Sequence, residues 1–177
     1  PPKTTGLYSY LESRGGKYPV TVFFGLQYIL KQYLTQPIEP WMVEEAKIFF
    51  AAHGVPFNEA GWRYIAEDLK GNLPILIQAV PEGAVVPVQN VLMTMKSTDP
   101  QVFWLVSWLE TLLLRVWYPT TVATQSWHLK RRIFHALEQT SDDPGTDIPF
   151  KLHDFGARGV SSCESSGIGG MAHLVNF

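Results

Sequence analysis

The sequence is poor in charged residues, and it contains a single cysteine. Asp, Glu, Lys and Arg make up 17% of the 177 residues, whereas about a quarter is usual for globular proteins. The formal net charge is −2, and the one basic run is 130–132. A general nucleic-acid binder would carry a basic excess, so the charge argues against this class. Cys163 has no second cysteine to pair with, which excludes an intrachain disulfide and fits a reducing compartment.

Long apolar segments are also missing. No apolar stretch reaches the roughly 20 residues that a membrane-spanning helix needs. The first residues, PPKTTGLYSY, have neither the basic start nor the apolar centre of a secretory signal peptide. We therefore expect a cytoplasmic protein.

Apolar and aromatic side chains are abundant, at 46% and 13% of the residues. With so little charge, such a chain is expected to bury apolar surface against another subunit or against further parts of the same protein. It begins at Pro1 without Met and ends in HLVNF, a strand-like segment that would need a neighbour to pair with. We expect the chain to be a piece of a longer one.

Hydrophobic periodicity and end signals predict helices interrupted by strands. The predicted elements are a strand at 6–12, helices at 22–34, 39–54 and 57–71, three short strands within 73–97, a helix after Asp99, a helix at 121–140, a strand at 150–155, a helix at 161–173 and a strand at 174–177. Asn58 is a predicted N-cap, Gly54 and Gly71 predicted helix ends, and Pro119 a predicted helix interruption. Strand, helix, strand in the last 30 residues is typical of the start of a β/α series.

Three further motifs have explanations other than a functional site. Asp154–Gly156 matches the metal-holding tripeptide of protein kinases, but the catalytic loop and the Gly-rich loop with its strand Lys are missing. Gly167–Ala172 matches a dinucleotide fingerprint, but a serine-rich helical stretch precedes it where a strand is required, so close helix packing explains it better. His53, His128 and His135 have no second ligand at metal spacing, so we predict no metal site.

The segment KLHDFGARG carries the strongest functional signal. In a strand, Lys151, His153 and Phe155 would face one side and Asp154 the other. If that strand belonged to a barrel, its carboxyl end would lie at the active face. Phe155 offers a flat face to an aromatic ring, Arg158 offers a fork suited to phosphate oxygens, and two glycines free the backbone to bend around a ligand. The segment predicts a pocket for an aromatic ring beside a phosphate.

Five blocks of the sequence are informative together: VTVFFGLQYILKQYL, FNEAGWRYI, AVPEGAVVPVQNVL, TDPQVFWLVSWLETLLLRVWYPTTVAT and KLHDFGARGVSSCESSGIGGMAHLVNF, in that order. These blocks resemble the nicotinamide phosphoribosyltransferases and, more loosely, the nicotinate enzymes of the same superfamily. The resemblance implies synthesis of nicotinamide mononucleotide and pyrophosphate from nicotinamide and phosphoribosyl pyrophosphate. It also implies Mg²⁺, ATP as a coupled substrate, and a homodimer with active sites at the interface.

The resemblance assigns substrate-binding roles to four residues of this chain. Phe155 matches the residue that stacks on the pyridine ring, Arg158 matches the residue that holds the phosphate end, and Lys151 and His153 match residues that line the tunnel leading away from the ring. Ala157 departs from the pattern, because a Tyr is expected there in vertebrate members. The short loop 13–19 stands where many members have a longer one.

We expect an α/β fold with an N-terminal α+β domain, 1–117, followed by the first β/α units of an irregular α/β barrel, 118–177, incomplete in this chain. The second stacking ring, the specificity carboxylate and the phospho-accepting His are expected outside the chain. No catalytic residue is therefore assigned, and the piece alone is expected to be inactive. The alternatives are a nicotinate-specific enzyme and a non-catalytic assembly fragment.

Overall fold

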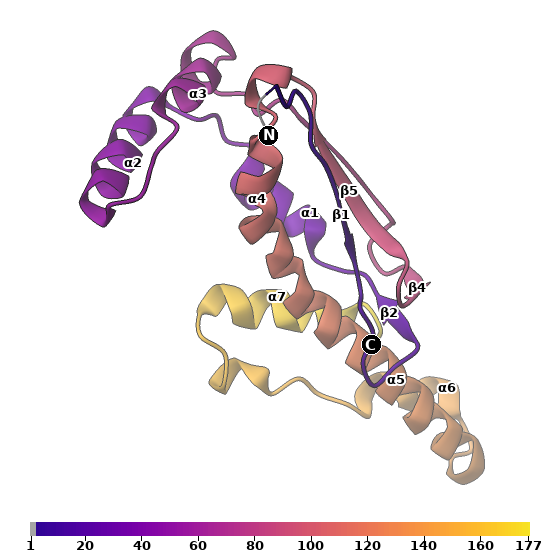
Figure 1. The fold of residues 1–177 in the computed structure, drawn as a ribbon. Helices are drawn as coiled ribbons and strands as arrows, with labels where there is room; N and C mark the ends of the chain where they lie inside the picture. Colours follow the sequence, from indigo (N-terminus) through magenta and orange to yellow (C-terminus); the bar gives the residue numbers. More distant parts are fainter. Residues whose placement is uncertain (1–2) are drawn as a thin grey trace. The chain divides into compact units, whose positions relative to one another are not determined.

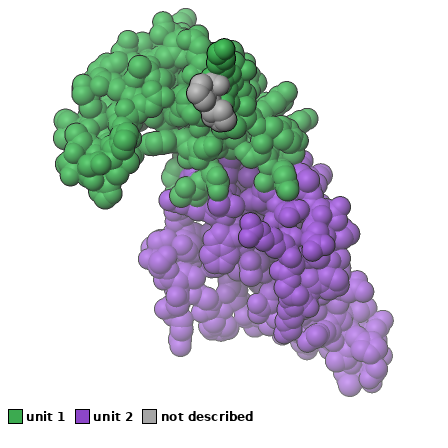
Figure 2. All heavy atoms as spheres, viewed as in Figure 1, with its two compact units in different colours: residues 1–10, 28–78, 94–111 green, residues 11–27, 79–93, 112–177 purple. Residues whose placement is uncertain are grey.

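The computed structural model describes residues 3–177, which divide into two compact units (Figures 1 and 2). Unit 1 contains the described residues of 1–10 together with 28–78 and 94–111. Unit 2 contains 11–27, 79–93 and 112–177. Each unit is thus assembled from segments that lie far apart in the sequence.

Helices account for 54% of the structure and strands for 13%, which confirms the predicted mixed α/β class. The strands are β1 Tyr8–Glu12, β2 Val20–Val22, β3 Ile75–Ala79, β4 Val85–Pro87 and β5 Val91–Ser97. The α-helices are α1 Leu26–Ile29, α2 Pro40–His53, α3 Glu59–Arg63, α4 Leu105–Leu113, α5 Trp117–Thr140, α6 Pro144–Asp147 and α7 Cys163–Leu174. The π-helical turns Leu30–Leu34 and Tyr64–Asp68 continue α1 and α3. One sheet has the order β1-β5-β3, and the other pairs β2 with β4.

The predicted helix ends are confirmed. The Asn58 side chain accepts a hydrogen bond of 3.2 Å from the backbone N–H three residues on and so caps α3. Gly54, after α2, and Gly71 have φ of 74° and 77°, the left-handed conformation that a residue without Cβ adopts at little cost. Asp99 caps the 3₁₀ turn Pro100–Val102 by accepting the backbone N–H two residues on at 2.9 Å.

The interruption predicted at Pro119 lies slightly earlier in the chain. A 3₁₀ turn, Leu114–Val116, separates α4 from α5, and Pro119 is the third residue of α5. A proline is tolerated in the first helical turn because the N–H groups there have no partner within the helix. The helix predicted from 121 therefore begins at Trp117.

Unit 1 is held together by aromatic rings from α2, α3 and α4. Trp62 of α3 is buried and meets Trp104 and Trp108 edge-on, with ring centroids 5.1 and 5.4 Å away. Phe50 of α2 lies 5.6 Å from the Trp108 ring and 5.3 Å from Phe57. Such pairs add about 0.5–1.5 kcal/mol each beyond the burial of apolar area.

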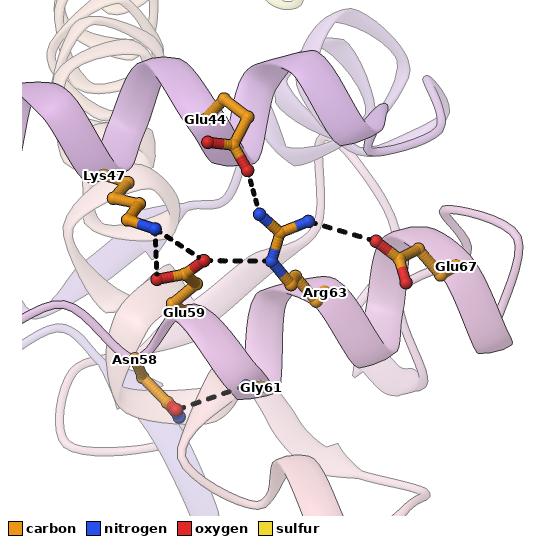
Figure 3. Close-up of polar contacts among 7 residues, drawn as sticks. All are labelled: Glu44, Lys47, Asn58, Glu59, Gly61, Arg63 and Glu67. Atoms are coloured by element: carbon orange, nitrogen blue, oxygen red, sulfur yellow. Dashed lines mark hydrogen bonds and ion pairs between the residues drawn. The ribbon is translucent and has the colours of Figure 1, made fainter.

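A surface network of ion pairs links α2 to α3 and its π-helical continuation (Figure 3). The Arg63 guanidinium donates to Glu59 at 3.0 Å, to Glu67 at 3.2 Å, and to Glu44 of α2. Lys47 of α2 contacts Glu59 at 2.9 Å. These groups are solvent-exposed in part, so each pair contributes at most about 1 kcal/mol.

Unit 2 is built on helix α5. β2 runs antiparallel to β4, with Val22 opposite Val85. Val22, Ala123 of α5 and Ala172 of α7 form one buried cluster, and the Val22 N–H donates to the Thr124 hydroxyl of α5 at 2.9 Å. The small alanines allow α7 to lie close beside α5 (Figure 1).

The strands predicted at 150–155 and 174–177 are wrong. Phe150 ends a 3₁₀ turn, 152–155 has no regular structure, Leu174 ends α7, and a turn follows it. A strand forms only where a neighbour satisfies its backbone groups, and the described strands pair within the two small sheets. Residues 118–177 as described form helices α5, α6 and α7 with two 3₁₀ turns and contain no strand. Their assignment to the start of a barrel stays a prediction.

The two compact units interleave along the chain and are not the predicted domains 1–117 and 118–177, whose boundary stays a prediction. Among residues 3–177, no helix combines the length and the apolar character needed to cross a membrane.

Candidate functional site

The predicted site segment KLHDFGARG lies in unit 2 and connects α6 to α7 (Figure 1). The 3₁₀ turn Ile148–Phe150 precedes it, and a second 3₁₀ turn, Gly156–Arg158, lies within it. All four predicted substrate-binding side chains therefore belong to one short connection, and all four residues are exposed.

Lys151 and His153 lie in the first half of this connection. The Lys151 N–H donates to the Ile148 carbonyl at 3.2 Å, which closes the preceding turn. Its ammonium lies 3.9 Å from a carboxylate oxygen of Asp147, an exposed pair of little energetic weight. His153 follows on the surface.

Phe155 presents its ring to solvent, with 76% of the residue exposed. Beside it, the Asp154 carboxylate accepts the Gly156 N–H at 2.7 Å, the local turn that Asp favours. Asp154 thus acts on its own backbone. An apolar ring left this open is available to an aromatic ligand.

Arg158 lies at the end of the second 3₁₀ turn, just before the capped start of α7. The Ser162 hydroxyl caps α7 by accepting the Ser165 N–H at 3.0 Å. A guanidinium at this position offers a planar fork of donors to phosphate oxygens. The segment therefore carries a cation and an open aromatic ring three residues apart.

The predicted alternation of side chains along 151–155 is wrong, because these residues do not form a strand. Irregular backbone lacks the two-residue period that would place Lys151, His153 and Phe155 on one face. Their roles as substrate-binding residues stay a prediction.

The sequence did not single out His173, which contacts this segment directly. His173 is 8% exposed, and its Nε2 lies 3.2 Å from the Leu152 carbonyl oxygen. The signal in the sequence is a histidine at the end of a helix made mostly of small residues, a position where a polar ring needs partners.

A separate cavity of about 400 Å³ also lies in unit 2. The loop residues Gly15, Lys17 and Tyr18 line it from one side, and Thr121 and Gln125 of α5 from the other. None of the residues of KLHDFGARG lines this cavity, so it does not complete the predicted site.

One carboxyl near the segment has a shifted pKa. Hydrogen bonds from the side chain and backbone of Thr146 hold the pKa of the Asp143 carboxyl below its ordinary value, because both favour the ionised form. Asp143 caps the short helix α6. Residues 3–177 contain no group of three or more His, Cys, Asp or Glu side chains arranged to hold a metal ion.

Comparison with known proteins gives a consistent result. A family model described as the N-terminal domain of nicotinamide phosphoribosyltransferase matches residues 1–77. The whole chain is 60% identical to a nicotinamide phosphoribosyltransferase of Xanthomonas campestris pv. campestris over 177 residues. Proteins of the same name from Acinetobacter baylyi and Mycoplasma pneumoniae are 27% and 29% identical, over 88% and 100% of this chain.

The chain spans less than half the length of these relatives: 38% of the Xanthomonas protein, 32% of the Acinetobacter protein and 44% of the Mycoplasma protein. The resemblance predicted from the five sequence blocks is confirmed by the family model and by the 60% identity along the whole chain. The chain is therefore homologous to the nicotinamide phosphoribosyltransferases and corresponds to an N-terminal portion of such a protein.

Proposed function

We propose that the complete protein carrying this chain makes nicotinamide mononucleotide and pyrophosphate from nicotinamide and phosphoribosyl pyrophosphate. The observation that carries the proposal is the 60% identity to a nicotinamide phosphoribosyltransferase over all 177 residues. In this reaction the pyridine nitrogen attacks the anomeric carbon of the ribose, a C–N bond forms, and pyrophosphate leaves with the electrons of the broken C–O bond.

Nicotinamide is a weak nucleophile, so positioning its ring against the anomeric carbon supplies much of the rate. Phe155 contributes a flat apolar face, and with 76% of the residue exposed its ring is accessible to a ligand. Arg158 holds phosphate oxygens through charge-assisted hydrogen bonds, which are stronger than neutral ones. Lys151 and His153 line the path away from the ring.

Mg²⁺ and ATP stay proposals drawn from the resemblance. The described residues offer no cluster of metal ligands, so they do not fit a protein-held Mg²⁺, and we derive no step through it. Mg²⁺ would instead arrive on the phosphates of phosphoribosyl pyrophosphate, because its oxygens are ligands that this ion prefers.

A homodimer with the active site at the interface is also a proposal. It is supported by the apolar residues that α2 leaves in solvent, Trp41, Ile48 and Phe49, exposed by 60%, 70% and 62%. Apolar side chains grouped in this way commonly mark a surface that another polypeptide covers.

Titration of the complete protein with nicotinamide, with and without phosphoribosyl pyrophosphate, tests the proposal through tryptophan fluorescence or calorimetry. We expect nicotinamide to bind, and nicotinate to bind more weakly. Tighter binding of nicotinate would favour the nicotinate-specific alternative, and no binding of either pyridine or of phosphoribosyl pyrophosphate would refute the enzymatic function.

A further inference from the structure

A buried histidine joins the predicted site segment to the helical core of unit 2. His173, near the end of α7, lies between two partners that are distant in the sequence. Its Nδ1 is 2.9 Å from the Ser126 hydroxyl of α5, and its Nε2 is 3.2 Å from the Leu152 carbonyl oxygen. Ser126 is itself buried, at 5% exposure.

The partners of the ring define its hydrogen-bonding state. A carbonyl oxygen only accepts, so Nε2 of His173 carries the proton in the contact with Leu152. In the neutral ring Nδ1 then accepts, and the Ser126 hydroxyl donates to it. The orientation of the ring is thereby fixed by α5, and the Nε2–H is aimed at the segment.

The surroundings of the ring keep it in place. Phe177 stacks on His173, with ring centroids 4.8 Å apart and planes 14° apart. The Asn176 amide donates to the Ala123 carbonyl of α5 at 2.9 Å, which ties the residues after α7 to the same helix. A side chain buried, stacked and hydrogen-bonded on both sides is a rigid support.

The contact between His173 and the Leu152 carbonyl lies one residue before His153 and three residues before Phe155 in the sequence. It spans 21 positions of the sequence, whereas the hydrogen bonds of Lys151 to Ile148 and of Gly156 to Asp154 connect near neighbours. The exposed, irregular backbone around Leu152 thus has a fixed point in the core. We propose that His173 is a positioning residue that holds the backbone at Leu152, and through it the substrate-binding side chains Lys151, His153 and Phe155.

This inference rests on the proposed function where it predicts a change in the KM for nicotinamide. Its prediction for hydrogen exchange of the segment rests on the contact between His173 and Leu152 alone. Misplacement of a substrate-holding segment by about 1 Å costs up to roughly a hundredfold in rate or affinity. Loss of the Nε2 contact should therefore weaken substrate binding more than it weakens the fold.

Two substitutions separate the two ring nitrogens. In His173→Gln the amide nitrogen reaches the position of Nε2 and keeps a donor for the Leu152 carbonyl. In His173→Asn the shorter side chain keeps a polar group near Nδ1 and Ser126 but cannot reach Leu152. His135→Asn, on the exposed part of α5, is the matched control.

The complete protein and its variants are compared by nicotinamide turnover, thermal unfolding and hydrogen–deuterium exchange of peptides covering 149–160. We expect His173→Asn to raise the KM for nicotinamide about tenfold or more and to speed exchange in this segment. His173→Gln should restore both readouts toward the parent values, and the control should change neither.

Two results would overturn the positioning role of His173, and a third would separate it from the proposed function. Equal loss of thermal stability and activity in the Asn and Gln variants would assign His173 to core packing and overturn the positioning role. Unchanged KM and unchanged exchange in His173→Asn would also overturn it. If the parent protein transfers no phosphoribosyl group, the proposed function fails, and the exchange measurement alone decides whether His173 holds the segment.

Discussion

The exposed residues of the segment KLHDFGARG include a tight local turn. Asp154 accepts the Gly156 N–H, and Phe155, which lies between these two residues, is 76% exposed. Phe150, five residues earlier, is almost equally exposed at 74% but has no predicted role at the site. The two phenylalanines therefore differ in proposed function and hardly at all in burial.

Phe155→Ala in the complete protein should weaken nicotinamide binding, with thermal stability unchanged. Loss of a stacked ring removes about 0.5–1.5 kcal/mol beyond burial, which corresponds to about two- to thirteenfold in affinity. Phe150→Ala is the control and should leave the Kd for nicotinamide at the parent value. Equal effects of the two substitutions in a calorimetric titration would remove Phe155 from the site.

Arg158→Ala should weaken phosphoribosyl pyrophosphate binding by about ten- to a hundredfold, since hydrogen bonds to charged groups contribute about 1.5–3 kcal/mol. Arg158→Lys should recover only part of this loss, because an ammonium lacks the planar fork of donors. Arg132→Ala, on the exposed face of α5, controls for the loss of one positive charge. Binding as tight in Arg158→Ala as in the control would contradict the role of Arg158.

Asp143 supplies a residue-scale prediction about pH. Its pKa in the folded protein lies below the ordinary value because Thr146 donates to the carboxylate. The cap therefore stabilises α6 fully above the unfolded-state pKa, and this contribution is lost as the pH falls through the folded-state pKa. An NMR titration should give an Asp143 midpoint below that of an unstructured Asp, and Thr146→Val should move the midpoint upward. No movement would show that the Thr146 hydroxyl is not the cause.

At the scale of elements, the ends of several helices could be predicted from the sequence, whereas the two strands predicted at 150–155 and 174–177 do not form. The ends of α2 and α3 follow from Asn58, Gly54 and Gly71, because caps and left-handed glycines act on the residues beside them in the sequence. The segment 150–155 has the composition of a strand, but a strand also needs a neighbour, and residues 3–177 pair it with none. The contact of His173 with Leu152 depends on how α7 packs on α5, which no local pattern reveals.

The small residues of α7 allow close packing, and the structure locates that packing at Gly169. A Cβ added to Gly169 would lie 2.7 Å from the Tyr118 hydroxyl of α5, whereas one added to Gly167 would meet nothing within 4 Å. Gly167→Ala should stabilise the protein by up to about 1 kcal/mol through helix propensity.

Gly169→Ala should lose this gain, since overpacking costs about 1–3 kcal/mol. Thermal unfolding of the complete protein should therefore give a lower Tm for Gly169→Ala than for Gly167→Ala, and Tyr118→Phe in the Gly169→Ala background should recover part of the difference. Equal Tm values for the two alanine variants would show that α7 does not approach α5 this closely at Gly169.

At the scale of the whole molecule, the low charge and the many aromatic residues leave large apolar side chains exposed on the surface. Several large apolar residues stay in solvent in the described chain, among them Trp41, Ile48 and Phe49 of α2. The chain also spans only 38% of the length of its Xanthomonas relative. Both observations support the expectation that further polypeptide covers this surface.

The most direct test of the account is product formation by the complete protein, with phosphoribosyl pyrophosphate and Mg²⁺ and either nicotinamide or nicotinate as the second substrate. We predict that nicotinamide mononucleotide and pyrophosphate appear in equal amounts with nicotinamide, and that nicotinate is used far more slowly. Absence of both mononucleotides, or faster use of nicotinate, would contradict the proposed nicotinamide phosphoribosyltransferase activity.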